Sequence, residues 1–323
     1  MGRITVRRRV TRITVGQEPK RREDVLAVEE PLEIRVGGKQ LAITMRTPGH
    51  DFDLAAGFLV SEGVIAQASD FGAARYCAGA TVDSQNSLMP ENTYNVLDVT
   101  LGFGVAPPDP SLERNFYTTS SCGLCGKASI DAVRTLSRHA VADDPLTIDA
   151  ELMASFPDRL RAGQDVFEKT GGLHAAALFD GRTGEMLVLR EDVGRHNAVD
   201  KVVGWALKEN LLPLTGMVLM VSGRASFELT QKASMAGIPI LAAVSAPSSL
   251  AVELAGELGL TVVGFLRGSS MVVYSADQRI LSEPSNASEP PNASERTDAS
   301  ERTDASEPAD TANQPILEKA DAS

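Results

Sequence analysis

Two cysteines separated by two residues are the groups in this chain best suited to covalent chemistry. Cys122 and Cys125 lie in Thr118–Lys127 (TTSSCGLCGK), among glycines and hydroxyl-bearing residues, and the 323-residue chain has only three cysteines. Residues 128–139 carry apolar side chains at helical spacing and predict a helix. The thiols would then stand at a helix N-terminus, where unpaired N–H groups and the helix dipole stabilise thiolate. Lys127 adds a positive charge, so the pattern indicates a reactive sulfur.

A cysteine pair of this spacing has three chemical interpretations: half of a zinc site, a dithiol redox pair, or a sulfur carrier that holds a persulfide. A structural zinc site normally needs a second ligand pair, and the remaining cysteine, Cys77, is expected to be an ordinary buried thiol. A zinc deaminase needs His-x-Glu and Pro-Cys-x-x-Cys; neither His174 nor His196 begins the first motif, and Ser121 replaces the proline. A thioredoxin-type pair follows an early strand of a small domain, which fits poorly. The alternative is that both cysteines are purely structural and carry no chemistry.

Three predicted strand ends combine arginine, glycine and hydroxyl groups. They are Arg190–Asn197, Ser222–Ser226 and Phe265–Ser270, and Arg224 in the second can bind phosphate with both arms of its guanidinium. Ligands of α/β sheets bind at the carboxyl ends of strands. Helix capping and salt bridges explain the first cluster equally well, and His174, a lone histidine, is most simply a loop or core residue. Together the three ends indicate a phosphate-bearing ligand such as a nucleotide.

The elements that must position these groups follow an α/β pattern. Apolar strands at 217–221, 239–244 and 261–265 alternate with helices at 226–236 and 247–258, which predicts a parallel sheet covered on both faces. Before them we expect a helical stretch at 148–163 interrupted at Pro157, strands at 175–179 and 186–189, and a helix capped by Asn197.

The N-terminal part reads as β-rich. Strands are expected at 4–6 and 11–15, a hairpin at 32–36 and 41–45 around Gly37 and Gly38, a helix at 51–60 and a strand at 95–101. The domain organisation is therefore a β-rich part at 1–115, an α/β core at 116–281 and an acidic tail at 282–323. Low hydrophobicity and excess acid predict that the tail is disordered.

Charge and composition exclude several classes of protein. The formal net charge is −12, of which the tail carries −7, so the body is mildly acidic and is not expected to bind nucleic acid. The basic residues near the N-terminus are expected to be the solvated face of an edge strand: Arg3, Arg7, Arg8, Arg9 and Arg12. No apolar run is long enough for a membrane span, and neither a secretory signal nor a disulfide framework is evident. We expect a cytoplasmic protein without membrane contact.

The motif Thr119–Lys127 resembles the signature of the formate dehydrogenase accessory sulfurtransferase family (FdhD). Further stretches carry the same resemblance, in order and from about residue 10 to 281: Pro48–Ile65, Thr170–Leu178, Glu191–Lys201, Ser222–Lys232, Ser245–Leu254 and Val263–Tyr274. It spans everything except the tail, so it is far more specific than a cysteine pair alone.

The resemblance implies a sulfur carrier with a fold similar to cytidine deaminases and a homodimeric assembly. Such proteins take sulfur from a cysteine desulfurase and pass it to the bis-molybdopterin guanine dinucleotide cofactor before its insertion into formate dehydrogenase. Cys122 would carry the persulfide, with Cys125 as its partner. The cofactor, bound as sulfur acceptor, would be contacted by Phe265, Leu266, Arg267, Gly268, Ser269 and Ser270, and no metal would be bound directly by the protein.

Two other functions remain alternatives. One is a zinc-dependent nucleoside or nucleotide deaminase, which stoichiometric zinc would favour. The other is a non-catalytic chaperone that binds the cofactor and the dehydrogenase, whose function would depend on Arg224 or Arg267 and not on the cysteines.

Overall fold

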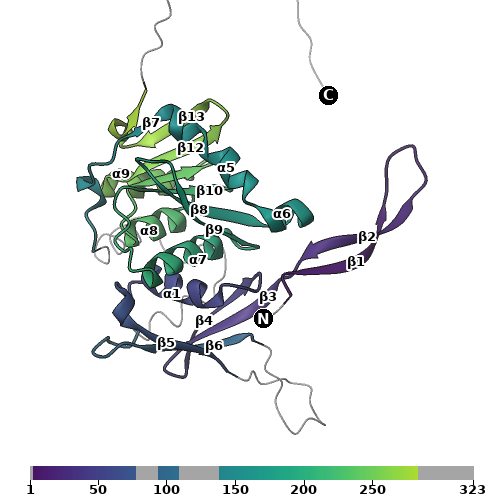
Figure 1. Cartoon of the computed structure of the whole chain (residues 1–323), viewed down its shortest axis with the longest axis horizontal. Coiled ribbons are helices and arrows are strands. Elements are labelled where there is room, and N and C mark those ends of the chain that lie inside the picture. The colour runs from purple at the N-terminus through teal and green to yellow at the C-terminus, as the bar shows by residue number, and fades with distance from the viewer. Residues whose placement is uncertain (1–2, 78–93, 109–137, 283–323) are drawn as a thin grey trace, which may run out of the picture. The chain divides into compact units, whose positions relative to one another are not determined.

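The structure, a computed structural model, describes residues 3–77, 94–108 and 138–282 (Figure 1). Contacts divide the chain into two units, Met1–Ser282 and Glu283–Ser323, and every described residue lies in the first. Cys122, Cys125, almost all of the helix predicted at 128–139 and almost all of the predicted tail fall outside the described residues.

The N-terminal layer is a four-stranded sheet in the order β4-β3-β6-β5. Its strands are β3 (Glu30–Val36), β4 (Lys39–Arg46), β5 (Phe71–Tyr76) and β6 (Val96–Leu101). The predicted hairpin is confirmed, with Gly37 and Gly38 at φ values of 58° and 80°, a left-handed backbone that favours glycine. Cys77 follows β5 and is half-buried, so it is more exposed than the predicted buried thiol.

The second layer is a six-stranded sheet in the order β13-β12-β11-β10-β8-β9. Its strands are β8 (His174–Asp180), β9 (Met186–Asp192), β10 (Met217–Val221), β11 (Ile240–Ala243), β12 (Thr261–Arg267) and β13 (Ser270–Ser275). The predicted parallel arrangement is confirmed for β10, β11 and β12. The outer strands lie outside that prediction and pair antiparallel: β8 with both β9 and β10, and β13 with β12. The short connections from β8 to β9 and from β12 to β13 allow only hairpins.

Both faces of this sheet are covered, as predicted. Along β8, Ala175, Ala177 and Phe179 point to one face and pack with Phe156, while alternate residues such as Leu178 join the core on the other face. The helices of the first face are α4 (Ala150–Ala154) and α5 (Phe156–Ala162). On the other side lie α7 (Arg195–Lys208), α8 (Phe227–Met235) and α9 (Ser249–Leu258).

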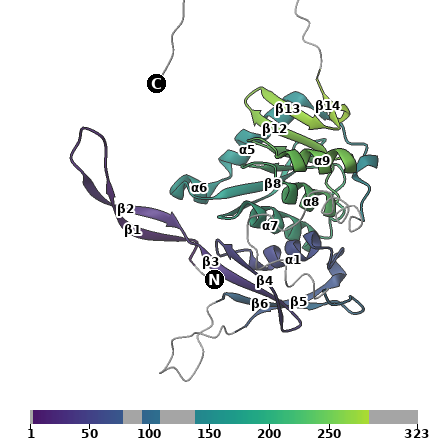
Figure 2. The ribbon, with the colours of Figure 1, turned by 180° about the vertical axis from the view of Figure 1, so that it is seen from behind.

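Helix α1 (Asp51–Ser61), confirmed where the sequence predicts a helix, joins the two layers. It lies with α7 between the four-stranded and six-stranded sheets (Figures 1 and 2). The two helices cross at glycines: a Cβ on Gly57 would lie 1.9 Å from the carbonyl oxygen of Asp200, and one on Gly204 would lie 1.8 Å from that of Asp53. The helix backbones therefore touch, and no larger residue fits at the crossing.

Several elements differ from the sequence predictions. Asn197 does not cap a helix, because α7 begins two residues earlier with Gly194 as its cap. The interruption in the 148–163 stretch falls at Ser155, and Pro157 occupies the first turn of α5, where a missing N–H costs nothing. Other elements are not predicted by the sequence: strands β5 and β13, helix α6 (Asp165–Thr170), the short strands β7 (Ile148–Asp149) and β14 (Ile280–Leu281), and 3₁₀ turns at Ala68–Asp70, Val141–Asp143 and Asp277–Arg279.

The first strands form a separate two-stranded ribbon, β1 (Thr5–Arg12) and β2 (Lys20–Ala27). The strand predicted at 11–15 is wrong beyond Arg12, and β2 is not predicted because its polar composition hides the strand period. The predicted solvated face is confirmed: Arg7, Arg8, Arg9 and Arg12 lie exposed on β1, which pairs with β2 in this ribbon, and Arg3 precedes the strand. Among the described helices, none is long and apolar enough to cross a membrane.

Candidate functional site

A cleft of about 690 Å³ lies where strands of the six-stranded sheet end. Because β9, β10, β11 and β12 run in one direction and β8 in the other, the ends of the first four and the start of β8 meet at one edge. We call this the strand-end cleft. It is lined by Pro157, Asp158, Leu160, Arg161, Gln164, Phe167, Gly171, Gly172, Leu173, His174, Ser222, Val244, Leu266, Arg267 and Gly268.

The segment expected to contact the cofactor, residues 265–270, is split by the structure. Leu266, Arg267 and Gly268 line the cleft; Phe265, Ser269 and Ser270 are not among its lining residues. Arg267 donates from Nε to the carbonyl of Val244 at 2.9 Å, which holds this exposed side chain beside the cleft. Leu266 is fully buried and anchors the segment in the core.

Phe265 has an unusual backbone for a non-glycine residue. Its φ is 51°, its N–H donates to the carbonyl of Ser245 at 3.2 Å, and 43% of the residue is exposed. Such left-handed conformations cost free energy and persist only where the surrounding structure imposes them. The bond to Ser245 is one such constraint, and it presents an aromatic ring to solvent at the end of the sheet.

The start of β8 forms the opposite wall. Ser222 fastens it to the end of β10: its hydroxyl accepts from the N–H of Ala175 at 2.9 Å, and its own N–H donates to the carbonyl of Ala175 at 3.0 Å. Burial lowers the pKa of His174 below its ordinary value, and the nearby charges of Arg195 and His196 lower it further against the opposing effect of Asp192. His174 is therefore neutral at neutral pH, chiefly because its surroundings are partly shielded from water.

The third wall comes from α5 and α6, which the sequence reasoning did not connect with a site. The guanidinium of Arg161 lies 4.7 Å from the ring centroid of Phe167, a cation–π contact. The carboxylate of Glu191 accepts the N–H groups of Val166 and Phe167 at 2.9 and 2.8 Å, which fixes the start of α6. The N-cap residue of α6, Gln164, makes no side-chain cap bond, so no local signal marks the start of this helix.

Neither Arg224 nor the Arg190–Asn197 cluster lines the strand-end cleft. Arg224 is exposed and is not among the residues that line the cleft. The Arg190–Asn197 cluster is mostly structural: Asp192 is fully buried and accepts from Nζ of Lys201 at 2.6 Å, while Arg190 donates to Asp53 at 3.1 Å. The salt-bridge interpretation therefore holds for this segment, whereas the capping interpretation does not, because no side chain caps α7.

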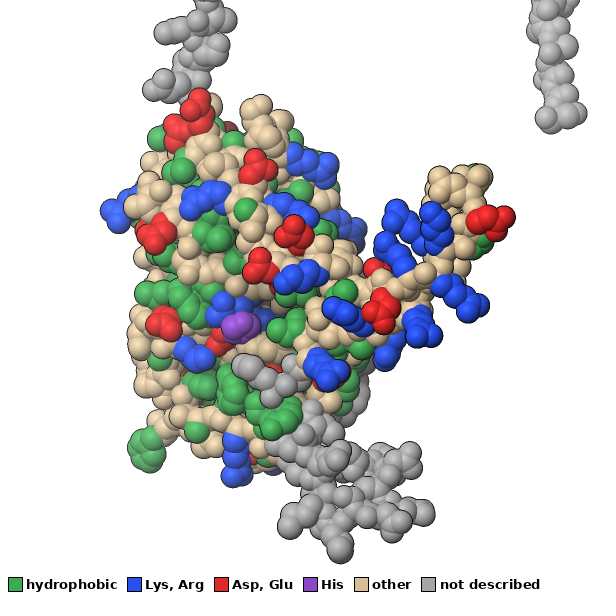
Figure 3. Space-filling model, turned by 45° about the vertical axis from the view of Figure 1, so that its right-hand side comes forward, with side chains coloured by type: hydrophobic (Ala, Val, Ile, Leu, Met, Phe, Trp, Pro, Cys, Tyr) green, Lys and Arg blue, Asp and Glu red, His purple; other side chains and the backbone are tan. Residues whose placement is uncertain are grey.

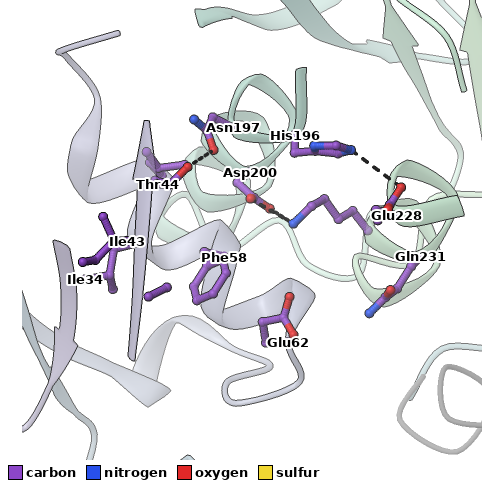
Figure 4. A pocket seen from close by; sticks show the side chains of 13 residues that line it. Ile34, Ile43, Thr44, Phe58, Glu62, His196, Asn197, Asp200, Glu228 and Gln231 are labelled. Carbon is purple, nitrogen blue, oxygen red and sulfur yellow. Dashed lines mark hydrogen bonds and ion pairs between the residues drawn. The ribbon is translucent and has the colours of Figure 1, made fainter. Parts of the chain in front are cut away.

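A second, smaller cavity of about 230 Å³ lies between the two layers (Figure 4). Its polar wall holds the ion pair of Asp200 and Lys232 at 2.7 Å and, on the rim, His196 3.7 Å from Glu228. A hydrogen bond with His196 lowers the pKa of Glu228 to about 2. Burial raises the pKa of Glu62, whose side chain also faces this cavity. Most of its charges are matched internally, in contrast to those of the strand-end cleft.

The charges of the strand-end cleft suit an anionic ligand. Arg161 and Arg267 line it with Asp158 as the one carboxylate among the lining residues. Two guanidinium groups and the consecutive glycines Gly171 and Gly172 are among the groups that bind phosphate.

Comparison with known proteins shows the family of this chain. The profile of the FdhD/NarQ family matches residues 27–281. The chain belongs to the FdhD/NarQ family. Among FdhD proteins, the sulfur carrier protein FdhD of Streptomyces avermitilis is 65% identical over 281 residues, which cover 87% of this chain and 97% of the relative. The sulfur carrier protein FdhD of Mycobacterium tuberculosis is 58% identical over 280 residues, 87% of this chain and all of the relative.

A solved structure shows the same fold. The crystal structure of a candidate formate dehydrogenase accessory protein from Desulfotalea psychrophila superposes with a TM-score of 0.63 at 22% identity, and covers 86% of this chain and 100% of its own. This FdhD-family chain therefore shares its mixed α/β fold with a protein to which its sequence is only 22% identical. The likeness to cytidine deaminases stays a prediction.

Proposed function

We propose that this chain is a sulfur carrier that serves formate dehydrogenase. It accepts sulfur from a cysteine desulfurase as a persulfide on Cys122 and passes it to bis-molybdopterin guanine dinucleotide before that cofactor is inserted. The observation that carries the proposal is the 65% identity, over 97% of its length, to a relative named sulfur carrier protein FdhD. The Cys122–Cys125 pair lies inside the span matched by the family profile.

The loading step is a thiol–disulfide type of exchange. The Cys122 thiolate attacks the outer sulfur of the desulfurase persulfide, the sulfur–sulfur bond of the donor breaks, and the desulfurase cysteine leaves as a thiolate. The outer sulfur remains formally at the zero oxidation level, so no external electrons are consumed. Lys127, next but one to Cys125, supplies positive charge that favours the thiolate form of these cysteines.

The delivery step needs two electrons, and Cys125 can supply them. Its thiolate attacks the inner sulfur of the Cys122 persulfide, which forms a Cys122–Cys125 disulfide and releases hydrosulfide to the acceptor. A dithiol reductant then restores both thiols. The pair therefore serves as carrier and reductant together, a role that a single cysteine cannot fill.

The strand-end cleft would hold a phosphate-bearing part of the acceptor. Its volume, about 690 Å³, lies within the roughly 300–1,000 Å³ that small-molecule sites occupy. Arg161 and Arg267 would pair with phosphate oxygens, and the exposed ring of Phe265 could stack on a planar group. We further propose that the chain acts as a homodimer in the cytoplasm and holds no metal of its own.

Mass spectrometry after incubation with a cysteine desulfurase and L-cysteine tests the central claim. One bound sulfur adds about 32 Da, and this addition is expected for the unmodified chain and for Cys125→Ala but not for Cys122→Ala. Cys125→Ala would hold its persulfide longer because it cannot release hydrosulfide. Persulfide on Cys122→Ala at the level of the unmodified chain would contradict the proposal.

Two measurements separate the alternatives. One equivalent of zinc on the purified chain, with hydrolytic release of ammonia from a nucleoside, would favour a deaminase. A chaperone predicts that both cysteine variants sustain formate dehydrogenase activity in co-expression while Arg224→Gln or Arg267→Gln abolishes it. Sulfur transfer predicts the opposite outcome for Cys122→Ala.

A further inference from the structure

The β1–β2 ribbon carries a concentration of positive charge that the proposed sulfur chemistry does not use. It extends away from the two layers, and lysine and arginine side chains gather along it (Figure 3). Residues 3–27 hold eight basic and three acidic residues, whereas residues 28–282 hold 20 basic and 30 acidic ones. The ribbon therefore bears +5 on a chain whose remaining body bears −10.

The charges are least balanced toward the turn of the ribbon. Nearer the body, Arg7 lies 3.8 Å from Glu23 and Arg22 lies 3.2 Å from Asp24. At the far end, Arg12 stands directly opposite Lys20 in the strand register. Like charges in facing positions destabilise a strand pair. In the described part of the chain neither residue forms an ion pair, so this end of the ribbon is arranged at a cost in folding stability.

Apolar side chains accompany the charges at the same end. Ile13 and Val15 follow β1 directly, and they are 73% and 99% exposed. The ribbon has two strands, and α6 is the element of the body with which it makes its main contact, through β2. A two-stranded hairpin is marginally stable by itself in water. The structure thus maintains an exposed, cationic and partly apolar end that gains stability from any surface that covers it.

We infer that the β1–β2 ribbon docks an acidic patch on a partner protein. Arg12, Lys20 and the neighbouring Arg21 would meet carboxylates, while Ile13 and Val15 would meet apolar atoms between them. A nucleic acid fits less well, because a long polyanion would also approach the acidic body, and because Glu18, Glu23 and Asp24 interrupt the basic ribbon. Interleaved charges of both signs suit the patterned surface of a protein.

The arrangement assigns separate roles to the two ends of the ribbon. Nearer the body, Arg7 pairs with Glu23 across the strands and Arg22 pairs with Asp24 within β2, whereas the unpaired charges at the far end remain available for contact. The family profile begins at residue 27, where β2 ends, so the proposed docking surface lies outside the span that the profile matches.

The test uses the full chain and a fluorescent 20-residue poly-L-glutamate as the probe, with binding followed by anisotropy at two salt concentrations. The variant R12Q/K20Q removes the facing pair. The control K39Q/R182Q removes two exposed basic residues of the body, so the net charge of the two variants is identical. Each exposed ion pair contributes about 0.2–1 kcal/mol, so loss of two weakens binding about two- to thirtyfold.

We expect the control to bind within twofold of the unmodified chain and R12Q/K20Q to bind clearly more weakly, with a reduced dependence on salt. R12Q/K20Q should keep or raise the melting temperature, because the facing repulsion is gone, so loss of binding would not reflect unfolding. Equal weakening in both variants would overturn the inference. So would tighter binding of a 20-base-pair DNA duplex, or concentration-dependent self-association that R12Q/K20Q abolishes.

Discussion

The two layers and the strand-end cleft both hold charged residues, but those between the layers are buried and paired, whereas the arginines of the cleft are exposed and, within the described chain, unpaired. Between the layers, Arg46 pairs with Asp51 through two bonds of 3.1 and 3.0 Å, and Lys201 pairs with Asp192 at 2.6 Å, with all four residues at most 2% exposed. In the cleft, Arg161 and Arg267 are exposed, and no ion pair joins either to a carboxylate in the described residues. Charge that is buried must be paired, whereas charge held in a cleft stays available to a ligand.

The difference shows which groups hold the fold and which can act. Asp192 also accepts from the N–H groups of Thr47 and Gly194 at 3.1 and 2.8 Å and from the amide of Asn197 at 3.1 Å. These bonds connect the strand-end loop after β9 with the N-terminal layer. A fully satisfied buried network fixes one arrangement of the two layers, and the cleft residues are positioned on this frame.

The largest expected effect comes from opening the buried network. Lys201→Met leaves the Asp192 carboxylate buried without its cation, and should cost about 3–5 kcal/mol of unfolding free energy. Lys208→Met is the control: Lys208 is on the same helix and pairs with Asp53 at 2.7 Å, but its side chain is 45% exposed. It should cost about 1 kcal/mol or less. Urea denaturation measures both, and equal losses would refute the contrast.

The helix crossing provides the next largest effect. Gly57→Ala would place a Cβ against the backbone of α7 and should cost about 1–3 kcal/mol or more through overpacking. Gly256→Ala, in the exposed face of α9 with no atom near its Cβ, should stabilise by about 0.5–1 kcal/mol. Thermal melting of the two variants in parallel measures both changes in stability. A neutral Gly57→Ala would mean that the layers can separate without loss.

A substitution in the strand-end cleft should weaken ligand binding and leave the stability of the fold unchanged. Arg267→Gln is expected to leave the free energy of unfolding within about 0.5 kcal/mol, because its side chain is exposed. If the cleft holds the proposed acceptor, loss of a charge-assisted bond worth about 1.5–3 kcal/mol should weaken the binding of guanosine diphosphate, used as a probe for its nucleotide part, roughly tenfold or more. Calorimetric titration measures this affinity, with Arg182→Gln as the control of equal charge. Unchanged affinity in Arg267→Gln would remove Arg267 from the site.

The smallest expected effect is a dependence of stability on pH. The pKa of His174 is lowered chiefly by burial. Below pH 6.5 the unfolded chain takes up this proton more readily than the folded one, so this contribution to stability falls as the pH drops toward the folded-state pKa. His174→Gln should flatten that part of the profile. NMR titration of the His174 ring protons checks the direction, and a pKa at or above 6.5 would contradict the environment described for the cleft.

Local sequence determined the elements with strong internal patterns. The hairpin at Gly37–Gly38, helix α1 and strand β10 lie where periodicity and turn residues predict them. Each depends on neighbours within a few residues, so the chain itself carries the signal. The grouping of strand ends at one edge also follows, because parallel strands share their direction.

Tertiary structure alone decided which polar residues are structural and which face the cleft. Asn197 reads as a helix cap and instead bonds the buried Asp192 and the carbonyl of Met45, more than 150 residues away. Arg161 gives no sequence signal; it lines the cleft beside the ring of Phe167, whose N–H donates to Glu191. The sequence names the residues that can carry charge. Burial and long-range pairing, which depend on residues far apart in the chain, determine where that charge is neutralised and where it remains free for a ligand.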